Sequence, residues 1–331
     1  MTTALANEMT VLVAGTGSIG RRHIDSLRQL APDARFVLLR RQAIEDDYSR
    51  RIDAKVVDSL DAGLAERPGI AVIAVPSSGH AELIVPLLGA GIPLYVEKPV
   101  VATRAQLEAV ARAAATAPST VTLCGCNLRF LPSLRAVREL IGAGAIGRVV
   151  RASLQTGQWL PDWRPSADYR RSYSASRELG GGVALDLVHE LDAVRWILGE
   201  FDSVVALGGQ FSSLELSSED AVVIGLSRAR GPVVAVGLDY VARRPVRRYE
   251  FFGEQGTLSW DLPARRVELT QVDGVPAPAF DAGDFDVAAT YVQAMREFLE
   301  AVASGRQTSQ DLAEGLKSAA LAIRVNEEIR K

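Results

Sequence analysis

The sequence contains few of the residues on which several classes of protein depend. Cysteine occurs only twice, at Cys124 and Cys126, so neither a disulfide framework nor a metal site follows from it. The two alternate along one expected strand, and we expect a reduced, buried pair whose side chains point the same way. No apolar run approaches the roughly 18 to 20 residues that span a bilayer, and the first eight residues lack a secretion signal. We therefore expect a cytoplasmic protein that does not cross a membrane.

Neither sign of charge is in large excess. The chain has 37 Lys and Arg residues against 40 Asp and Glu residues, a net charge of −3 at pH 7. This balance argues against nucleic acid or an anionic membrane as a bulk partner. With 331 residues, of which 48% are hydrophobic, the chain predicts two domains with ample core.

A glycine-rich turn, GTGSIG at residues 15–20, lies between an apolar strand and a helix. Such a turn needs glycine where the chain turns tightly (Gly15), where the backbone approaches a pyrophosphate (Gly17) and where the helix packs on the strand (Gly20). The pyrophosphate then binds free N–H groups at the positive end of the helix. With a second strand beyond the helix, the turn predicts a dinucleotide site.

The residue at the end of the second strand decides which dinucleotide fits. Arg40 and Arg41 follow that strand, twenty residues after Gly20, where an NAD site has an Asp or Glu for the ribose 2′-OH. A guanidinium instead suits a 2′-phosphate, which it binds through bidentate, charge-assisted hydrogen bonds. A solvated basic strand end is the ordinary alternative. We expect NADP to be preferred, with NAD possible.

Strand and helix patterns alternate over the first 125 residues. Strands are expected at 9–14, 35–39, 54–57, 70–75, 93–96 and 119–125, and helices at 19–30, 80–89 and 104–115. This alternation predicts an α/β fold whose parallel, doubly wound sheet carries helices on both faces. We place a Rossmann dinucleotide-binding domain at residues 1–125, with a helix at about 132–141 leading out of it.

Period-two patterns dominate the remainder of the chain. Strands are expected at 149–158, 203–211, 221–227, 233–241, 248–252, 256–262 and 266–271, and helices at 184–198, 287–303 and 309–328. They predict a large, open, mostly antiparallel sheet. We place a substrate-binding and oligomerisation domain at residues 126–331, whose final helix can pack back on the Rossmann domain.

Two motifs end neighbouring strands at the carboxyl edge of the first sheet. VPSSGH at 75–80 ends the fourth strand, and EKP at 97–99 ends the fifth. Open α/β sheets bind their ligands at this edge. Lys98 can lie there between nicotinamide and substrate, where cofactor charge and desolvation lower a lysine pKa towards neutrality and suit it to move a proton. A surface turn is the ordinary interpretation of a Lys before a Pro.

A third motif, GGGVALDLVH at 180–189, opens the expected helix of the second domain. Asp186 and His189 are three residues apart and share one helix face. A packed histidine and an Asp that stabilises the helix dipole are the ordinary alternatives. The chain has only three histidines, however, and His23, His80 and His189 all fall within or soon after these glycine- or serine-rich turns. Together the motifs predict hydride transfer with a Lys/His proton relay.

These stretches together resemble the Gfo/Idh/MocA oxidoreductases. The resemblance is carried by residues 15–23 (GTGSIGRRH), 75–80, 97–99, 127–132 (NLRFLP), 144–149 (GAIGRV), 180–196 and 252–258 (FGEQGTL). It implies a Rossmann domain and a C-terminal α/β domain whose open sheet pairs subunits into homodimers or homotetramers. It also implies NAD(P)-linked oxidation or reduction of a hydroxyl or keto group on a sugar, polyol or sugar nucleotide.

The resemblance further implies roles for individual residues. Lys98 matches the proton-transferring or substrate-orienting lysine, with a cis bond to Pro99. Asp186 and His189 match the Asp and His of the family's glycine-rich helix segment, with the His as general acid/base, and Arg129 matches an arginine that faces the substrate cleft. The residues expected to bind the cofactor are Gly15, Gly17, Ser18, Ile19, Gly20, Arg40, Arg41, Val75, Pro76, Ser77, His80, Glu97 and Lys98.

Two positions depart from the family pattern. The family usually spaces its Asp and His four residues apart, whereas Asp186 and His189 are three apart. Both spacings place the pair on one helix face, so the departure leaves open whether Lys98 or His189 is the principal proton-transfer group. Arg40 replaces the common acid, which moves the expected cofactor towards NADP.

The segment 160–179 is long, polar and rich in arginine, and long loops inside compact domains are usually functional. The candidate substrate contacts are Arg129, Trp163, Arg164 and Tyr173. The arginines indicate an acidic or phosphorylated substrate such as a nucleotide sugar. A salt-bridged surface loop is the alternative, and no metal site is expected.

Two other functions fit the same motifs. A redox-assisted glycosidase would retain its NAD(P) and cleave a glycosidic bond with no net consumption of nucleotide. A non-catalytic, NADP-sensing regulator would need neither Lys98 nor His189, and this chain has both. We expect an NADP-preferring dehydrogenase or ketoreductase that acts on a carbohydrate-like small molecule.

Overall fold

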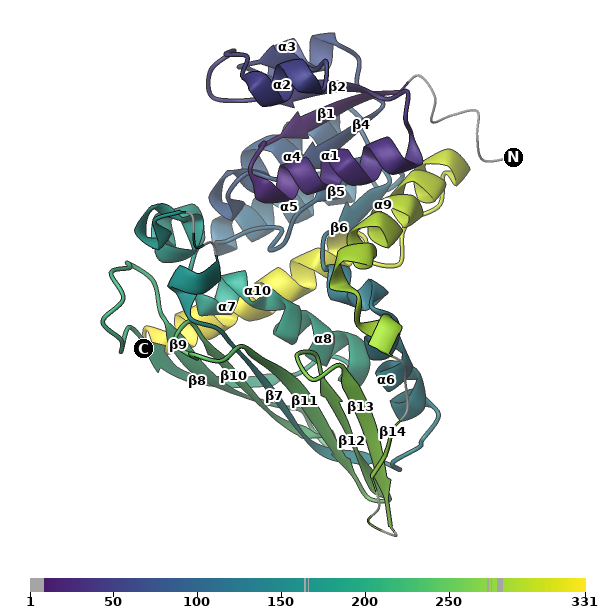
Figure 1. Cartoon of the computed structure of the whole chain (residues 1–331), viewed down its shortest axis with the longest axis vertical. Coiled ribbons are helices and arrows are strands. Elements are labelled where there is room, and N and C mark those ends of the chain that lie inside the picture. Colours follow the sequence, from purple (N-terminus) through teal and green to yellow (C-terminus); the bar gives the residue numbers. More distant parts are fainter. Residues whose placement is uncertain (1–8, 164, 166, 273, 275, 279–281) are drawn as a thin grey trace. The chain divides into compact units, whose positions relative to one another are not determined.

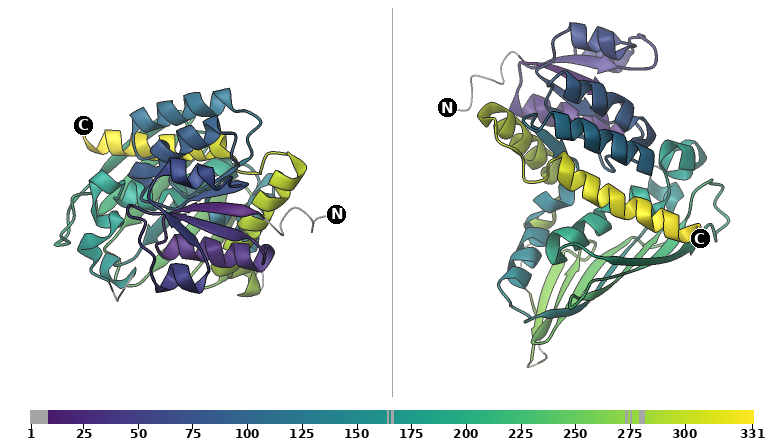
Figure 2. Two further views of the ribbon diagram at one scale, coloured as in Figure 1. Left: turned by 90° about the horizontal axis from the view of Figure 1, so that it is seen from above. Right: turned by 180° about the vertical axis from the view of Figure 1, so that it is seen from behind.

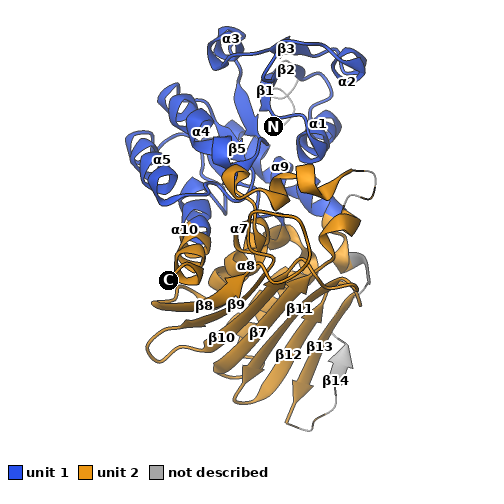
Figure 3. Cartoon of the chain, turned by 90° about the vertical axis from the view of Figure 1, so that its left-hand side faces the viewer, with its two compact units in different colours: residues 1–127, 288–319 blue, residues 128–287, 320–331 orange. Residues whose placement is uncertain are grey.

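The computed structural model describes residues 9–331 except 164, 166, 273, 275 and 279–281. The chain divides into two compact units, which Figure 3 colours separately. Unit 1 comprises residues 1–127 and 288–319, and unit 2 comprises residues 128–287 and 320–331. Unit 1 is therefore assembled from two separate stretches of sequence.

Unit 1 contains a six-stranded sheet in which every pairing is parallel. Its strands are β1 (Thr10–Ala14), β2 (Arg35–Leu39), β3 (Lys55–Val57), β4 (Ile70–Ile73), β5 (Leu94–Val96) and β6 (Thr122–Cys124). They lie in the order β3-β2-β1-β4-β5-β6, so the strand order reverses between β1 and β4. Ligands of such sheets bind at this reversal, outside the carboxyl ends of the strands. The predicted parallel, doubly wound sheet is confirmed.

Helices cover both faces of this sheet. They are α1 (Ser18–Leu30), α2 (Asp47–Arg51), α3 (Leu60–Ala65), α4 (His80–Gly89), α5 (Arg104–Thr116), α9 (Val287–Ser304) and α10 (Leu312–Ile329), of which α10 continues into unit 2. Figures 1 and 2 show α1 on one face and α4 with α5 on the other. All residues of β1 and β4 are accordingly buried, because a strand covered on both faces needs apolar side chains on each.

The segment between α9 and α10 runs along the outer edge of β6. The backbone N–H of Cys124 donates to the carbonyl oxygen of Gln310 over 2.9 Å. The hydroxyl of Thr308 donates to the carbonyl oxygen of Thr122 over 2.6 Å. Backbone groups that an edge strand would expose are therefore paired by the late part of the chain.

Unit 2 contains an eight-stranded sheet. Its strands are β7 (Val149–Gly157), β8 (Ser203–Gly209), β9 (Ala221–Ser227), β10 (Val233–Asp239), β11 (Val246–Gly253), β12 (Gly256–Asp261), β13 (Arg266–Gln271) and β14 (Pro276–Pro278). Their order is β14-β13-β12-β11-β7-β10-β9-β8, with β7 and β10 parallel and the other pairs antiparallel. The prediction of a large, mostly antiparallel sheet is confirmed.

One face of this second sheet is covered and the other is open. The helices of the unit are α6 (Pro132–Gly142), α7 (Val183–Asp186) and α8 (Val188–Leu198), and α6 and α8 lie against one face in Figure 1. Side chains alternate accordingly, with Val234 and Val236 fully buried on β10 while Val233, on the opposite face, is 60% exposed. Such alternation is typical of a sheet with one solvated face.

The structure corrects one sequence expectation about this unit. A single helix was expected over 184–198, but α7 ends at Asp186 and α8 begins at Val188. Leu187 between them has φ −94° and ψ +33°, which is outside the helical region. The described residues of the segment 160–179 include four short 3₁₀ turns, Leu160–Trp163, Tyr169–Arg171, Tyr173–Ala175 and Arg177–Leu179.

Two kinds of feature are absent from the described residues. None of their helices is both long enough and apolar enough to pass through a membrane. No group of three or more His, Cys, Asp or Glu side chains among them is arranged to hold a metal ion. Cys124 and Cys126 are buried thiols, with their sulfur atoms 3.8 Å apart.

Candidate nucleotide and substrate sites

The glycine turn joins β1 to α1 in unit 1. Gly15 has φ +93°, and a Cβ there would lie 2.5 Å from the carbonyl oxygen of Ala74. A Cβ on Gly20 would lie 2.0 Å from the carbonyl oxygen of Gly15, so α1 packs closely on the turn. A Cβ on Gly17, by contrast, would meet no described atom within 4 Å. The space beside the first turn of α1 is therefore open.

Among the described residues, no side chain caps the N-terminus of α1. Gly17 is its N-cap and offers no side chain, and the first turn contains no acidic residue. The N–H groups of Ser18, Ile19 and Gly20 lie at the positive end of the helix, where no intrahelical acceptor precedes them. These residues fit the pyrophosphate of a dinucleotide.

Arg40 lies at the carboxyl end of β2, as expected, but its guanidinium is already bound. One Nη donates to Oδ1 of Asp46 over 3.1 Å, and the other donates to the carbonyl oxygen of Ile44 over 3.1 Å. The backbone N–H of Arg40 donates to the carbonyl oxygen of Val57 over 2.9 Å. The neighbouring Arg41 is exposed.

The loop after β4 is fastened by its histidine. Four predicted cofactor residues lie here, Val75, Pro76, Ser77 and His80. The ring of His80 is 1% exposed, and its Nε2 and Nδ1 lie 2.9 Å and 3.2 Å from the carbonyl oxygens of Val75 and Val100. Burial lowers the pKa of His80. His80 therefore ties this loop to the segment that follows Lys98 and Pro99.

Glu97 and Lys98 directly follow β5. One carboxylate oxygen of Glu97 lies 2.7 Å from Nε2 of His23, a fully buried residue of α1. The other accepts the backbone N–H of Lys98 over 3.2 Å. The bond from Lys98 to Pro99 is cis, as expected. The carboxylate of Glu97 thus connects α1 to the backbone of the predicted catalytic lysine.

Two tyrosines pack around His23 and Glu97. The ring of Tyr95 is 4.5 Å from that of His23, and the ring of Tyr291 in α9 is 6.1 Å away and edge-on. Burial raises the pKa of both tyrosines, and the charge of Glu97 acts in the same direction. Their phenols therefore stay protonated at neutral pH. The His23–Glu97 pair is enclosed by neutral aromatic rings.

Asp186 is the centre of a hydroxyl cluster in unit 2. It is 2% exposed and accepts hydrogen bonds from three hydroxyls: Tyr173, Ser174 over 2.7 Å, and Tyr240 over 3.1 Å. Burial raises the pKa of Tyr240, and the charge of Asp186 acts in the same direction. The carboxylate of Asp186 therefore accepts its hydrogen bonds from neutral hydroxyl groups.

The expectation that Asp186 and His189 share one helix face is corrected, because the two residues belong to different helices. Asp186 ends α7, where its carboxylate is anchored to Ser174 and Tyr240. The chain then turns at Leu187 before α8 starts. The three residues from Asp186 to His189 span a helix break, so the helical repeat does not place the two side chains on one face.

His189 is positioned by the residue that follows it. Glu190 is fully buried and accepts hydrogen bonds from Thr156 of β7 and Tyr249 of β11, each over 2.8 Å. One of its oxygens also lies 2.8 Å from Nε of Arg247. These contacts fix the rotation of α8 on the sheet. The half-buried His189 is thereby held at a defined place on that helix.

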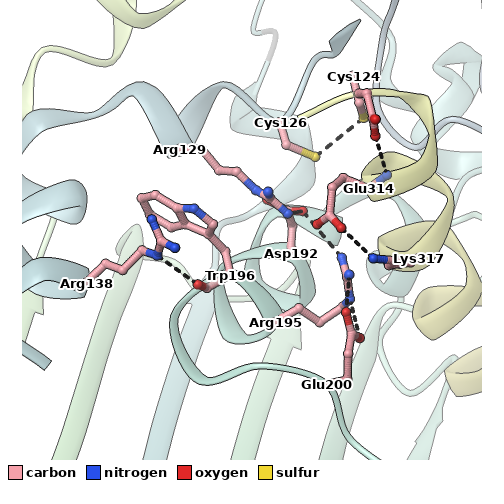
Figure 4. Close-up of polar contacts among 11 residues, drawn as sticks. Cys124, Cys126, Arg129, Arg138, Asp192, Arg195, Trp196, Glu200, Glu314 and Lys317 are labelled. Atoms are coloured by element: carbon pink, nitrogen blue, oxygen red, sulfur yellow. Dashed lines mark hydrogen bonds and ion pairs between the residues drawn. The ribbon is translucent and has the colours of Figure 1, made fainter. Parts of the chain in front are cut away.

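Arg129, predicted to contact substrate, instead makes a buried ion pair. Its Nε and one Nη donate to the two carboxylate oxygens of Asp192 over 2.8 and 2.7 Å. Its guanidinium also lies 5.9 Å from the ring of Trp196. Figure 4 shows this pair near a second one between Arg195 and Glu200, which are 2.5 Å apart. Arg129 thus fastens the start of unit 2 to α8, and its contact with substrate stays a prediction.

The folded loop of unit 2 lines a pocket of about 390 Å³. Its lining residues are Leu160, Trp163, Ala167, Asp168, Tyr169, Arg171, Ser172 and Ser174. The ring of Trp163 meets that of Tyr240 edge-on at 5.4 Å, and Ser174 also donates to Asp186. The pocket therefore adjoins the hydroxyl cluster. Arg164 lies outside the described residues.

Several residues of these arrangements were not selected as site residues from the sequence. Ser174 and Tyr240 reach Asp186 from separate segments, and no motif marks either of them. Asp46 reaches Arg40 from the start of α2. His23 could have been found, because it is one of only three histidines and follows the glycine turn.

Comparison with known families agrees with this geometry. Residues 9–124 match the model of an oxidoreductase family with an NAD-binding Rossmann fold, and residues 134–259 match that of the GFO/IDH/MocA C-terminal domain. The chain belongs to the Gfo/Idh/MocA oxidoreductase family. The expected family, the fold class and the enzyme class, a dehydrogenase acting on CH–OH groups, are confirmed.

Known relatives and solved structures cover nearly the whole chain. Inositol 2-dehydrogenase of Rhizobium meliloti (strain 1021) is 25% identical over 93% of both chains. A levoglucosan dehydrogenase in complex with NADH and levoglucosan superposes with a TM-score of 0.85, at 19% identity over 98% of this chain and 97% of that one. For myo-inositol 2-dehydrogenase from Lactobacillus plantarum the TM-score is 0.81, at 16% identity over 98% and 97%. These solved structures share the fold.

Proposed function

We propose that this protein oxidises a hydroxyl, or reduces a keto group, of a cyclic polyol, sugar or sugar nucleotide, with NADP preferred over NAD. The observation that carries the proposal is the arrangement at the end of β5, where Glu97 connects His23 to the backbone of Lys98. This arrangement follows a strand at the carboxyl edge of the sheet, close in strand order to the reversal at which such folds bind ligands. The nicotinamide, when bound, supplies the hydride acceptor or donor.

The chain's own residues divide the remaining tasks. The open first turn of α1 binds the pyrophosphate. Lys98 and His189 hold or move the proton of the reacting hydroxyl, since an amine and an imidazole can each serve as a general acid or base. Asp186 positions the loop that carries Tyr173, because it accepts the phenolic proton of that residue in a hydrogen bond.

The substrate class is supported by the pocket in unit 2. Its lining combines an indole, a phenol and hydroxyls with Arg171, a composition that suits the alternating apolar and hydroxyl surfaces of a sugar ring. The relatives named above are dehydrogenases of inositol and levoglucosan, which are both cyclic and rich in hydroxyls. We include acidic and nucleotide-linked sugars because Arg171 lines the pocket.

Substitution of Lys98 tests the proposal. Lys98→Met keeps the length of the side chain and removes the exchangeable proton, so turnover should fall at least about 100-fold, as for loss of a general acid or base. Binding of NADPH, followed by the change in its fluorescence, should stay within about threefold of the wild type. The substrate panel comprises inositols, anhydrosugars, uronic acids and nucleotide sugars. Full turnover by Lys98→Met on the true substrate would exclude the mechanism.

We also propose that two copies pair through the open face of the second sheet. That face exposes Val205, Leu207, Val223 and Val233, each at least 60% exposed in the single chain. An apolar surface of this kind on a stable sheet is typical of a subunit interface. Light scattering on a Val223→Lys variant would then give a smaller particle than the wild type.

A further inference from the structure

The strand β2 ends without an acidic residue, but the next helix, α2, places a carboxylate beside its end. Asp46 lies at the start of α2 and its Oδ1 accepts a hydrogen bond from Arg40 over 3.1 Å. Arg40 directly follows β2, and its side chain is 16% exposed while that of Asp46 is 44% exposed. The pair therefore borders solvent at the position where a dinucleotide's ribose is read.

Asp46 is held in place independently of Arg40. It is the N-cap of α2: its Oδ1 accepts the backbone N–H of Ser49 over 2.8 Å, and its own N–H donates to the hydroxyl of Ser49 over 2.9 Å. These two bonds form a capping box, which fixes the side chain. The hydrogen bonds from Ser49 and Arg40 also hold the pKa of Asp46 below its usual range. The carboxylate is therefore ionised and stationary at neutral pH.

We propose that Asp46 sets the nucleotide preference of this site by competing for Arg40. The inference depends on the proposed binding of NAD(P). A 2′-phosphate needs the guanidinium of Arg40, which in this structure is engaged by Asp46 and by the carbonyl oxygen of Ile44. To bind NADP, Arg40 leaves or shares a fixed carboxylate, and that carboxylate repels the phosphate. NAD carries a neutral 2′-hydroxyl on its ribose, so its binding neither requires Arg40 to leave Asp46 nor brings a negative charge next to that carboxylate.

The competition lowers the preference for NADP without abolishing it. Arg41 is exposed and supplies a second guanidinium to a 2′-phosphate. Asp46 can itself accept a hydrogen bond from a ribose 2′-OH, which is the task of the acid that usually ends β2. The site should accordingly bind both nucleotides, with affinities closer together than an arginine-only site would give.

Asp46→Asn is the decisive variant. Asparagine caps a helix about as well as aspartate, so α2 should persist while the charge disappears. We expect the dissociation constant for NADPH, measured from nucleotide fluorescence, to fall about fivefold, because an exposed ion pair and its repulsion are worth a modest factor. The constant for NADH should change less than twofold. The gain in NADPH affinity should shrink as the salt concentration rises from about 0.05 to about 0.5 M, because salt screens interactions between exposed charges.

Two further variants identify the cause. Asp47→Asn removes the same charge one residue along, where the partner is Arg50 at 2.6 Å, and it should leave the ratio of NADPH to NADH affinity unchanged. In an Arg40→Met background, Asp46→Asn should lose most of its gain in NADPH affinity, since its effect acts through Arg40. Asp46→Ser, another neutral capping residue, repeats the test if the Asn variant folds poorly, as judged by thermal unfolding without nucleotide.

The outcomes separate this inference from the function on which it rests. If the wild type binds neither NADPH nor NADH, the proposed function fails. If it binds them and neither neutral variant of Asp46 shifts the ratio, the function stands and the role of Asp46 is excluded. An equal shift in Asp47→Asn would also exclude it, because net charge alone would then be responsible.

Discussion

Glu97 in unit 1 and Asp186 in unit 2 are both buried carboxylates beside residues proposed to act in the reaction, yet they are held differently. Glu97 lies against the imidazole of His23 and a backbone N–H. Asp186 accepts hydrogen bonds from three hydroxyl groups, those of Tyr173, Ser174 and Tyr240. The first is held by one ring nitrogen and one backbone N–H, and the second by side-chain hydroxyls.

This difference separates two ways of positioning a catalytic group. Glu97 joins His23 of α1 to the backbone N–H of Lys98, so a change on the helix side can alter the position of the lysine. The three hydroxyls around Asp186 instead converge on one carboxylate, which holds the loop that carries Tyr173 and Ser174. Unit 1 therefore uses a carboxylate as a link between two segments, and unit 2 uses one as the centre of a cluster.

The largest effect is expected from removal of the carboxylate of Asp186. In Asp186→Asn, one carboxylate oxygen becomes an NH₂ donor that faces hydroxyl donors, so buried polar groups lose their partners. We expect the free energy of unfolding to fall by about 2–3 kcal/mol, and turnover to fall at least about 100-fold as the loop bearing Tyr173 loosens. Urea unfolding and steady-state kinetics measure the two effects.

Tyr240→Phe is the matched control for that variant. It removes one hydroxyl and leaves those of Tyr173 and Ser174 on the carboxylate. Its cost should be about 1 kcal/mol, the usual contribution of one hydrogen bond. If Asp186→Asn were no less stable than Tyr240→Phe, the three hydroxyls would not be organised by the charge of Asp186.

The second test concerns His23, with two replacements that separate hydrogen bonding from packing. His23→Leu removes the contact with Glu97, and we expect about a tenfold lower kcat from a loosened Lys98, with nucleotide affinity within about threefold. His23→Gln retains an N–H donor toward Glu97 and should recover part of the lost kcat. An unchanged kcat in both variants would mean that His23 only fills space.

The smallest expected effect concerns a third buried carboxylate, Glu219, and the way in which the stability of the fold depends on pH. Glu219 is 5% exposed and accepts the backbone N–H of Ala184 over 3.3 Å. Burial raises its pKa above the ordinary value of 4.5. Because the folded state then holds the proton more tightly than the unfolded state, Glu219 favours folding below pH 4.5 and loses this contribution as pH rises through the folded-state pKa.

Glu219→Gln should therefore gain stability relative to the wild type as pH rises from 4 to 8. Thermal unfolding of both proteins across that range gives the difference in Tm, which should move in favour of the variant. A constant difference in Tm for Glu219→Gln would show that its carboxylate is better solvated than its burial indicates.

Much of the fold could be predicted because its determinants are local. The apolar run of β4 and the glycines of the first turn depend on neighbours in sequence, and the period-two pattern of β9 and β10 reports burial directly. Element boundaries accordingly agree closely with expectation. The position of Lys98 after a buried strand could be predicted for the same reason.

The parts that could not be predicted depend on contacts across the chain. The break at Leu187 follows no proline or glycine, and it coincides with the anchoring of Asp186 to hydroxyls from two distant segments. The ion pair of Arg40 with Asp46 needs the capping geometry of a five-residue helix. The burial of Arg129 needs its partner Asp192, 63 residues away. A sequence pattern shows which residues are present and leaves their pairings undetermined.

The segment that pairs with β6 has a consequence for how the protein is made. On the ribosome, β6 is complete at residue 124, but the partner of its outer edge, Gln310, is synthesised much later. During that interval the nascent chain presents an unpaired, apolar strand, which is a template for pairing with another chain. A stop codon before residue 307 would make this exposure permanent. Truncations that remove Thr308 and Gln310 should therefore yield aggregates rather than a smaller folded enzyme.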